Sequence, residues 1–158
     1  MHLISNGINK MNDKTSDGIS KEEWKEIEEL AEKIVSADDS DDENLAREYT
    51  RDIIRKLNNL QNKYGDLPSI LATKADYVDD INQALIILKK AYEIAQSMND
   101  KKNLTLISSS LAQKYIEELE DNKQGKIWLD ELRINLNNSY DDYEFKEYIR
   151  LRKFGDTK

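Results

Sequence analysis

The sequence contains no cysteine, a single proline, five glycines and one histidine in 158 residues. Without cysteine there is neither a disulfide framework nor thiolate chemistry. Glycine and proline are too few for the many turns of an all-β fold, so helices are expected. No apolar run reaches the roughly 18 residues of a membrane-spanning helix, and Met1–Lys10 lacks the apolar core of a secretory signal. These absences predict an all-helical cytoplasmic protein without a membrane segment.

The charge balance is acidic, with 32 Asp and Glu against 24 Lys and Arg, a net charge of −8. Nucleic acid and anionic membrane surfaces are therefore poor partners, because binding them requires an excess of cations. The charged fraction is 35%, above the roughly 25% of ordinary globular domains. A thin array of helices, which has much surface per residue, would have this composition. A neutral or basic protein or peptide is the partner that the charge favours.

Residues with catalytic or ligand-binding chemistry are scarce. His2, the only histidine, lies in a polar N-terminal stretch, which disfavours general acid–base catalysis and a histidine-ligated metal. The glycines are isolated, so no phosphate-binding loop is present. The acidic run Asp38–Glu43 lacks the glycine and the alternating ligands of a calcium loop, and a solvated loop is expected there. We therefore predict no catalytic residue, no metal site and no cofactor, and hence a protein that is not an enzyme.

Apolar residues recur at steps of three and four, which predicts six helices in three antiparallel hairpins and one further helix. The hairpins cover residues 20–65, 67–100 and 102–137, the terminal helix covers 140–154, and a flexible arm covers 1–19. Ser20–Glu23 matches a capping box at the start of the first helix. The acidic stretch Ser36–Asp42 is expected to end that helix. Residues 20–158 are thus expected to form one helical domain.

The hairpin 67–100 resembles a tetratricopeptide repeat. Leu71 and Ala72 match the bulky and small pair of the first helix of such a repeat. Ala84 matches the small residue that opens the second helix, and Leu88 and Ala91 match its following large and small positions. The spacing from Ala72 to Ala84 needs no gap.

The hairpin 102–137 repeats this pattern. Leu111 and Ala112 again supply the pair, Tyr115 takes the aromatic position, and Gly125 follows if one residue is inserted in the predicted turn Asp121–Gly125. The two repeats are 40 residues apart, whereas the usual period is 34. The resemblance is weaker over residues 20–65. It implies a solenoid of about three hairpins with a C-terminal capping helix, while a generic α-helical bundle would show the same apolar stripes.

The resemblance also implies a concave face lined by the first helix of each hairpin. Residues expected to bind a partner there are Ser69, Thr73, Asp76, Tyr77, Ser109, Gln113 and Glu117. The terminal helix, which carries aromatic residues beside arginines, is a second candidate surface. It is either a cap on the last hairpin or a contact site.

The leading functional hypothesis is a protein–protein interaction module, a scaffold or adaptor that binds a neutral or basic segment. The alternative is a small acidic inhibitor, such as a toxin-immunity or phage anti-defence protein, which blocks a basic surface of a target enzyme. Three hairpins leave apolar end faces, so a homodimer is also expected under the repeat interpretation.

Overall fold

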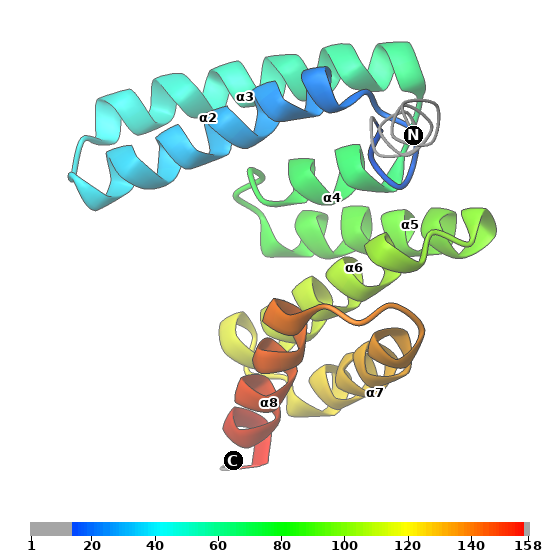
Figure 1. The fold of residues 1–158 in the computed structure, drawn as a ribbon. Coiled ribbons are helices and arrows are strands. Elements are labelled where there is room, and N and C mark those ends of the chain that lie inside the picture. Colours follow the sequence, from blue (N-terminus) through cyan, green and yellow to red (C-terminus); the bar gives the residue numbers. More distant parts are fainter. Residues whose placement is uncertain (1–13, 157–158) are drawn as a thin grey trace, which may run out of the picture. The chain divides into compact units, whose positions relative to one another are not determined.

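The computed structural model describes residues 14–156, which form seven α-helices and one π-helical turn (Figure 1). Strand pairing in this range is limited to one bridge between Lys14 and Ser20. The all-α class and the packing of neighbouring helices are thereby confirmed. One domain over residues 20–158 is the expectation from the sequence. By its internal contacts the chain divides into two compact units, one up to Ile70 and one from Leu71.

The first unit is built around a hairpin of two long helices, α2 (Lys21–Asp39) and α3 (Glu43–Tyr64). Trp24 is half-buried on α2. Val35, an apolar residue on the same helix, is 59% exposed. The core side chains contributed by the two helices are Ile27, Leu30, Ile34, Ala37, Ala46, Ile53, Leu57 and Leu60.

Both ends of α2 differ in detail from the sequence prediction. Ser20 does cap the helix, since its Oγ accepts from the Glu23 amide at 3.2 Å. The Glu23 carboxylate does not bond back to the backbone; it accepts from Ser20 Oγ at 2.8 Å, from Lys63 Nζ at 3.0 Å and from the Tyr64 hydroxyl. At the other end α2 continues past Ser36 to Asp39, because Ala37 is buried in the hairpin core.

These donors make the stability of the hairpin dependent on pH. Tyr64, followed by Ser20 and Lys63, lowers the pKa of Glu23 from 4.5 to about 2. A depressed carboxyl pKa contributes stability above the unfolded-state pKa, and this contribution is lost as pH falls through the folded-state pKa. We expect Glu23→Gln to lower the melting temperature at neutral pH. The difference from wild type should shrink as pH falls from about 5 to about 2.5.

Thermal unfolding followed by circular dichroism checks this prediction. Glu28→Gln is the matched control, because Glu28 is an exposed carboxylate near the middle of the same helix, away from its charged N-terminal turn. The control should leave the melting temperature within error of wild type at every pH. A Glu23→Gln difference that did not change with pH would contradict the assigned role of the carboxylate.

Residues 14–19, expected to belong to a flexible arm over 1–19, form a turn that packs on the first unit. Ile19 is fully buried. The Asp17 carboxylate accepts from the Ser69 amide at 2.7 Å and from the Ser69 hydroxyl at 2.9 Å. It therefore caps the N-terminus of α4 (Pro68–Ala75) from far away in the sequence. The rest of the predicted arm, residues 1–13, lies outside the described residues.

The second unit continues from α4 with α5 (Ile81–Met98), α6 (Lys101–Gln113), the π-helical turn η1 (Lys114–Glu118), α7 (Asn122–Asn138) and α8 (Asp142–Asp156). One core cluster joins α4, α5, α6 and η1, and a second joins α6, η1, α7 and α8. Trp128 packs against both clusters, and its ring meets that of Tyr92 edge-on at 5.0 Å.

A buried polar network ties three of these helices together. The amide of Asn135, which is 6% exposed, donates to the Tyr92 hydroxyl at 3.0 Å, to Ser108 Oγ at 3.1 Å and to the Leu104 carbonyl at 3.2 Å. Tyr92 in turn donates to Glu131 at 2.8 Å. Burial raises the pKa of Tyr92 to about 12, although its bond from Asn135 acts in the opposite sense.

Gly125 lies inside α7 and not in the turn that the sequence analysis placed at Asp121–Gly125. The helix already begins at Asn122, and Asp121 caps it by accepting from the Gln124 amide at 3.0 Å. A Cβ atom at position 125 would lie 2.2 Å from Cγ1 of Ile116. Glycine is therefore required for the close approach of α7 to the π-helical turn.

Candidate functional site

The residues predicted to line a concave face are divided between the two units. Ser69 belongs to the first unit, where it is bound to Asp17. Thr73 and Tyr77, in the second unit, are half-buried, and Asp76 is exposed. Thr73 lies on α4, and Asp76 and Tyr77 lie in the turn that follows it.

The predicted residues on α6 and η1 are largely engaged by the terminal helix. Arg150 of α8 donates two hydrogen bonds to the Glu117 carboxylate, both at 2.8 Å, and it holds the pKa of Glu117 below its usual range. Ser109 is only 6% exposed. Burial raises the pKa of Glu144 on α8, and a hydrogen bond from Ser109 acts in the opposite sense. Gln113 remains exposed.

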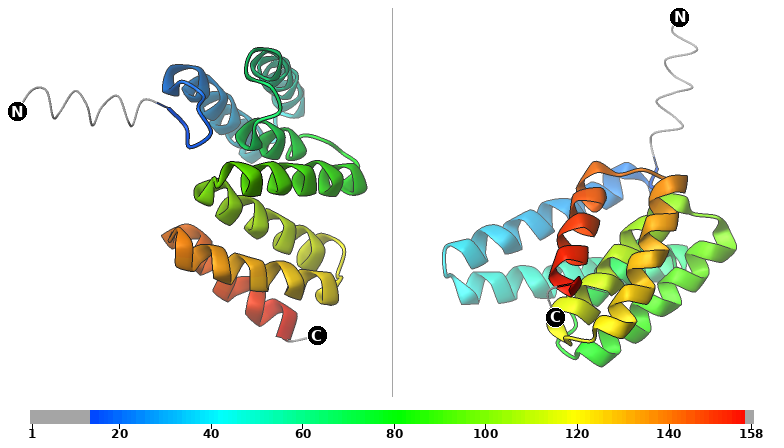
Figure 2. Two further views of the ribbon diagram at one scale, coloured as in Figure 1. Left: turned by 90° about the vertical axis from the view of Figure 1, so that its right-hand side faces the viewer. Right: turned by 90° about the horizontal axis from the view of Figure 1, so that it is seen from below.

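Helix α8 lies beside α7 and also contacts α6 and η1 (Figure 2). Tyr148 and Leu151 on its inner face are buried in the core cluster that α8 shares with α6, η1 and α7. Tyr143, which points elsewhere, is 69% exposed, and Tyr140, just before α8, is 64% exposed. The inner face therefore caps the last hairpin, while exposed aromatic residues remain available at the start of the helix.

The turn between α2 and α3 concentrates negative charge. Five of the six residues in Asp38–Glu43 are acidic, and all six are exposed. Asp42 caps α3 by accepting from the Leu45 amide at 3.1 Å, and Asp41 has a positive φ of 56°. We call Asp38–Glu43 the acidic tip. No three acidic or histidine side chains converge as metal ligands anywhere in residues 14–156.

The two units share the charge unequally. Residues 1–70 contain 16 acidic and 10 basic residues, a net charge of −6, which leaves −2 for residues 71–158. The acidic character of the chain thus belongs mainly to the first unit.

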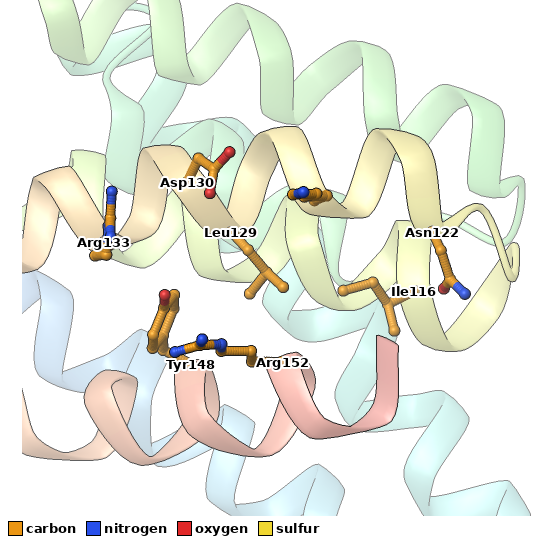
Figure 3. Close-up of a pocket in the computed structure, with 8 residues that line it drawn as sticks. Ile116, Asn122, Leu129, Asp130, Arg133, Tyr148 and Arg152 are labelled. Atoms are coloured by element: carbon orange, nitrogen blue, oxygen red, sulfur yellow. The ribbon is translucent and has the colours of Figure 1, made fainter. Parts of the chain in front are cut away.

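A pocket of about 360 Å³ opens between α7 and α8, entirely within the second unit. Leu129 of α7 faces Tyr148 and Arg152 of α8, Arg133 lies at one end, and Ile116 and Asn122 lie at the other (Figure 3). Lys126 and Asp130 of α7 complete the wall. The volume is at the low end of the roughly 300–1,000 Å³ of small-molecule sites. The sequence gives no sign of this pocket, because its cations come from two helices and none belongs to a recognisable motif.

No helix within residues 14–156 is both long and apolar enough to cross a membrane. In comparisons with known proteins, no family model matches the sequence, and no curated protein or solved structure matches it significantly.

Proposed function

We propose that this chain is a non-enzymatic interaction module of the helical-repeat kind, which binds a basic protein segment through the acidic tip. The observation that carries the proposal is a set of five exposed carboxylates in a stretch without a cation. A surface of one sign accelerates association with a partner of opposite charge and disfavours partners of like charge.

The repeat interpretation has support of its own. Tetratricopeptide repeats place small residues where their helices touch. Here the small residues Ala84, Ala91 and Ala112 are each at most 1% exposed. Gly125 allows Ile116 to approach so closely that any larger residue at position 125 would collide with it. The acidic tip also suits the alternative function, an inhibitor that blocks a basic surface of an enzyme. The two functions differ in whether the partner contributes a short segment or a folded domain.

The test compares the wild type with two variants of equal charge in affinity capture from a cell extract of the native host. The tip variant carries Asp38→Asn, Asp39→Asn, Asp41→Asn, Asp42→Asn and Glu43→Gln. Asn keeps the helix cap at position 42 and tolerates the positive φ at position 41. The control variant carries Glu22→Gln, Glu29→Gln, Glu48→Gln, Asp79→Asn and Glu93→Gln, all at exposed positions.

We expect a basic partner to be retained by the wild type and by the control variant and to be lost from the tip variant. With that partner purified, neutralising the tip should reduce the association rate by about tenfold or more at low ionic strength. The reduction should shrink as salt screens the charges. Equal retention by all three proteins would exclude the acidic tip as the contact surface. Competition by a peptide from the partner would favour an adaptor over an inhibitor of a folded enzyme.

A further inference from the structure

The pocket between α7 and α8 is cationic in a protein that is otherwise acidic. Lys126, Arg133 and Arg152 line it together with one acid, Asp130. None of these three cations forms an ion pair with any residue in the described part of the chain. This differs from Arg150 on the same helix α8, which is bound to both Glu117 and Glu147. The pocket therefore has positive charge that no ion pair neutralises.

The remaining wall is apolar. Ile116, Leu129 and Tyr148 are at most 9% exposed and form the side of the pocket that lies against the core. Such a wall suits a flat or compact apolar body.

The guanidinium groups of Arg133 and Arg152 present paired donors that match the oxygens of carboxylates and phosphates.

From these two features we propose that the pocket binds a small organic anion, with its carboxylate or phosphate at Arg133 and Arg152 and its apolar body against Leu129 and Tyr148. This site is independent of the acidic tip. The second unit would bind an anion, whereas the first unit would bind a basic partner. A body of roughly the size of one aromatic ring would suit this apolar wall.

Titration of the full-length protein with three small probes tests the proposal. The probes are 4-hydroxybenzoate, 4-hydroxyphenyl phosphate and neutral 4-hydroxybenzamide, followed by amide chemical shifts in nuclear magnetic resonance spectra. We expect both anions to perturb α7 and α8 with dissociation constants near the millimolar range, as is usual for molecules of about ten non-hydrogen atoms. The neutral amide should bind at least about tenfold more weakly. The tighter of the two anions identifies the group that the site prefers.

Matched variants separate specific binding from general charge attraction. Arg133→Gln and Arg152→Gln should each weaken anion binding by roughly tenfold. Lys123→Gln and Lys153→Gln remove the same charge from exposed positions on α7 and α8 that do not line the pocket, and they should have little effect. Absence of anion-dependent shifts in α7 and α8, or equal effects of the two pairs of variants, would overturn the proposal.

Discussion

Replacing Asn135 by Asp is expected to lower the free energy of unfolding by about 3 kcal/mol or more at neutral pH. The Asn135 amide donates to Tyr92, Ser108 and Leu104, and so connects α7 to α5 and α6. An aspartate has no donor for these acceptors, and it would place a negative charge against the Leu104 carbonyl. Burying a charge without a compensating partner is among the most destabilising single changes known in proteins.

The pH dependence of this variant gives a second readout. Burial should raise the folded-state pKa of the new carboxyl above its unfolded value of about 3.9. A raised carboxyl pKa means that the loss of stability is smallest below about pH 4 and grows as pH rises. Denaturant unfolding at several pH values measures the difference from wild type. Asn137→Asp, at an exposed position on the same helix, should cost less than about 1 kcal/mol. If Asn135→Asp cost no more than this control, the network would not be what holds the helices together.

Replacing Gly125 by Ala is expected to have opposite effects in two backgrounds. In the wild type, the added methyl group collides with Ile116, and overpacking of this kind costs about 1–3 kcal/mol. Ile116→Ala alone should cost about 2–5 kcal/mol, because Ile116 is only 1% exposed and leaves a cavity. In the Ile116→Ala background the collision is gone, and Ala is preferred over Gly within a helix by up to about 1 kcal/mol. There Gly125→Ala should stabilise the protein.

Unfolding free energies of the wild type, the two single variants and the double variant complete the cycle. The expected coupling between positions 116 and 125 is favourable by about 2 kcal/mol or more, which is large for a single pair. Additive effects would mean that α7 can move away from the π-helical turn at little cost. In that case close contact at Gly125 would not be required for the fold.

The positions of most helices could be predicted from the chain, because local signals coincide with apolar periodicity. Ser20, Asp100 and Asp121 each cap the helix that follows, and Gly65 and Asn99 end helices with positive φ. The π-helical turn at Lys114–Glu118 was not foreseeable, because its propensities are those of an ordinary helix. In this turn both Tyr115 and Ile116 are buried. Their burial depends on contacts with α7, whose residues lie further along the sequence.

The candidate binding sites could be predicted less well from the sequence than the helices. The register of a repeat assigned Ser109 and Glu117 to an open face, but Glu144 and Arg150 of α8 bind them. The periodicity of α8 shows that it has an apolar face, but not which neighbours that face covers. The pocket depends on the spacing of two helices. The acidic tip was visible as a run of carboxylates, although its full exposure required the hairpin geometry.

The division into two units gives each unit an intrinsic fluorescent reporter. The chain has only two tryptophans; Trp24 lies on α2 in the first unit, and Trp128 lies on α7 in the second. Trp128→Phe leaves emission that follows only the α2–α3 hairpin, and Trp24→Phe leaves emission that follows only the helices from α5 to α8. Coincident denaturation midpoints in the two variants would indicate one cooperative transition. Separate midpoints would indicate that the acidic hairpin and the anion pocket belong to halves that can fold and unfold independently.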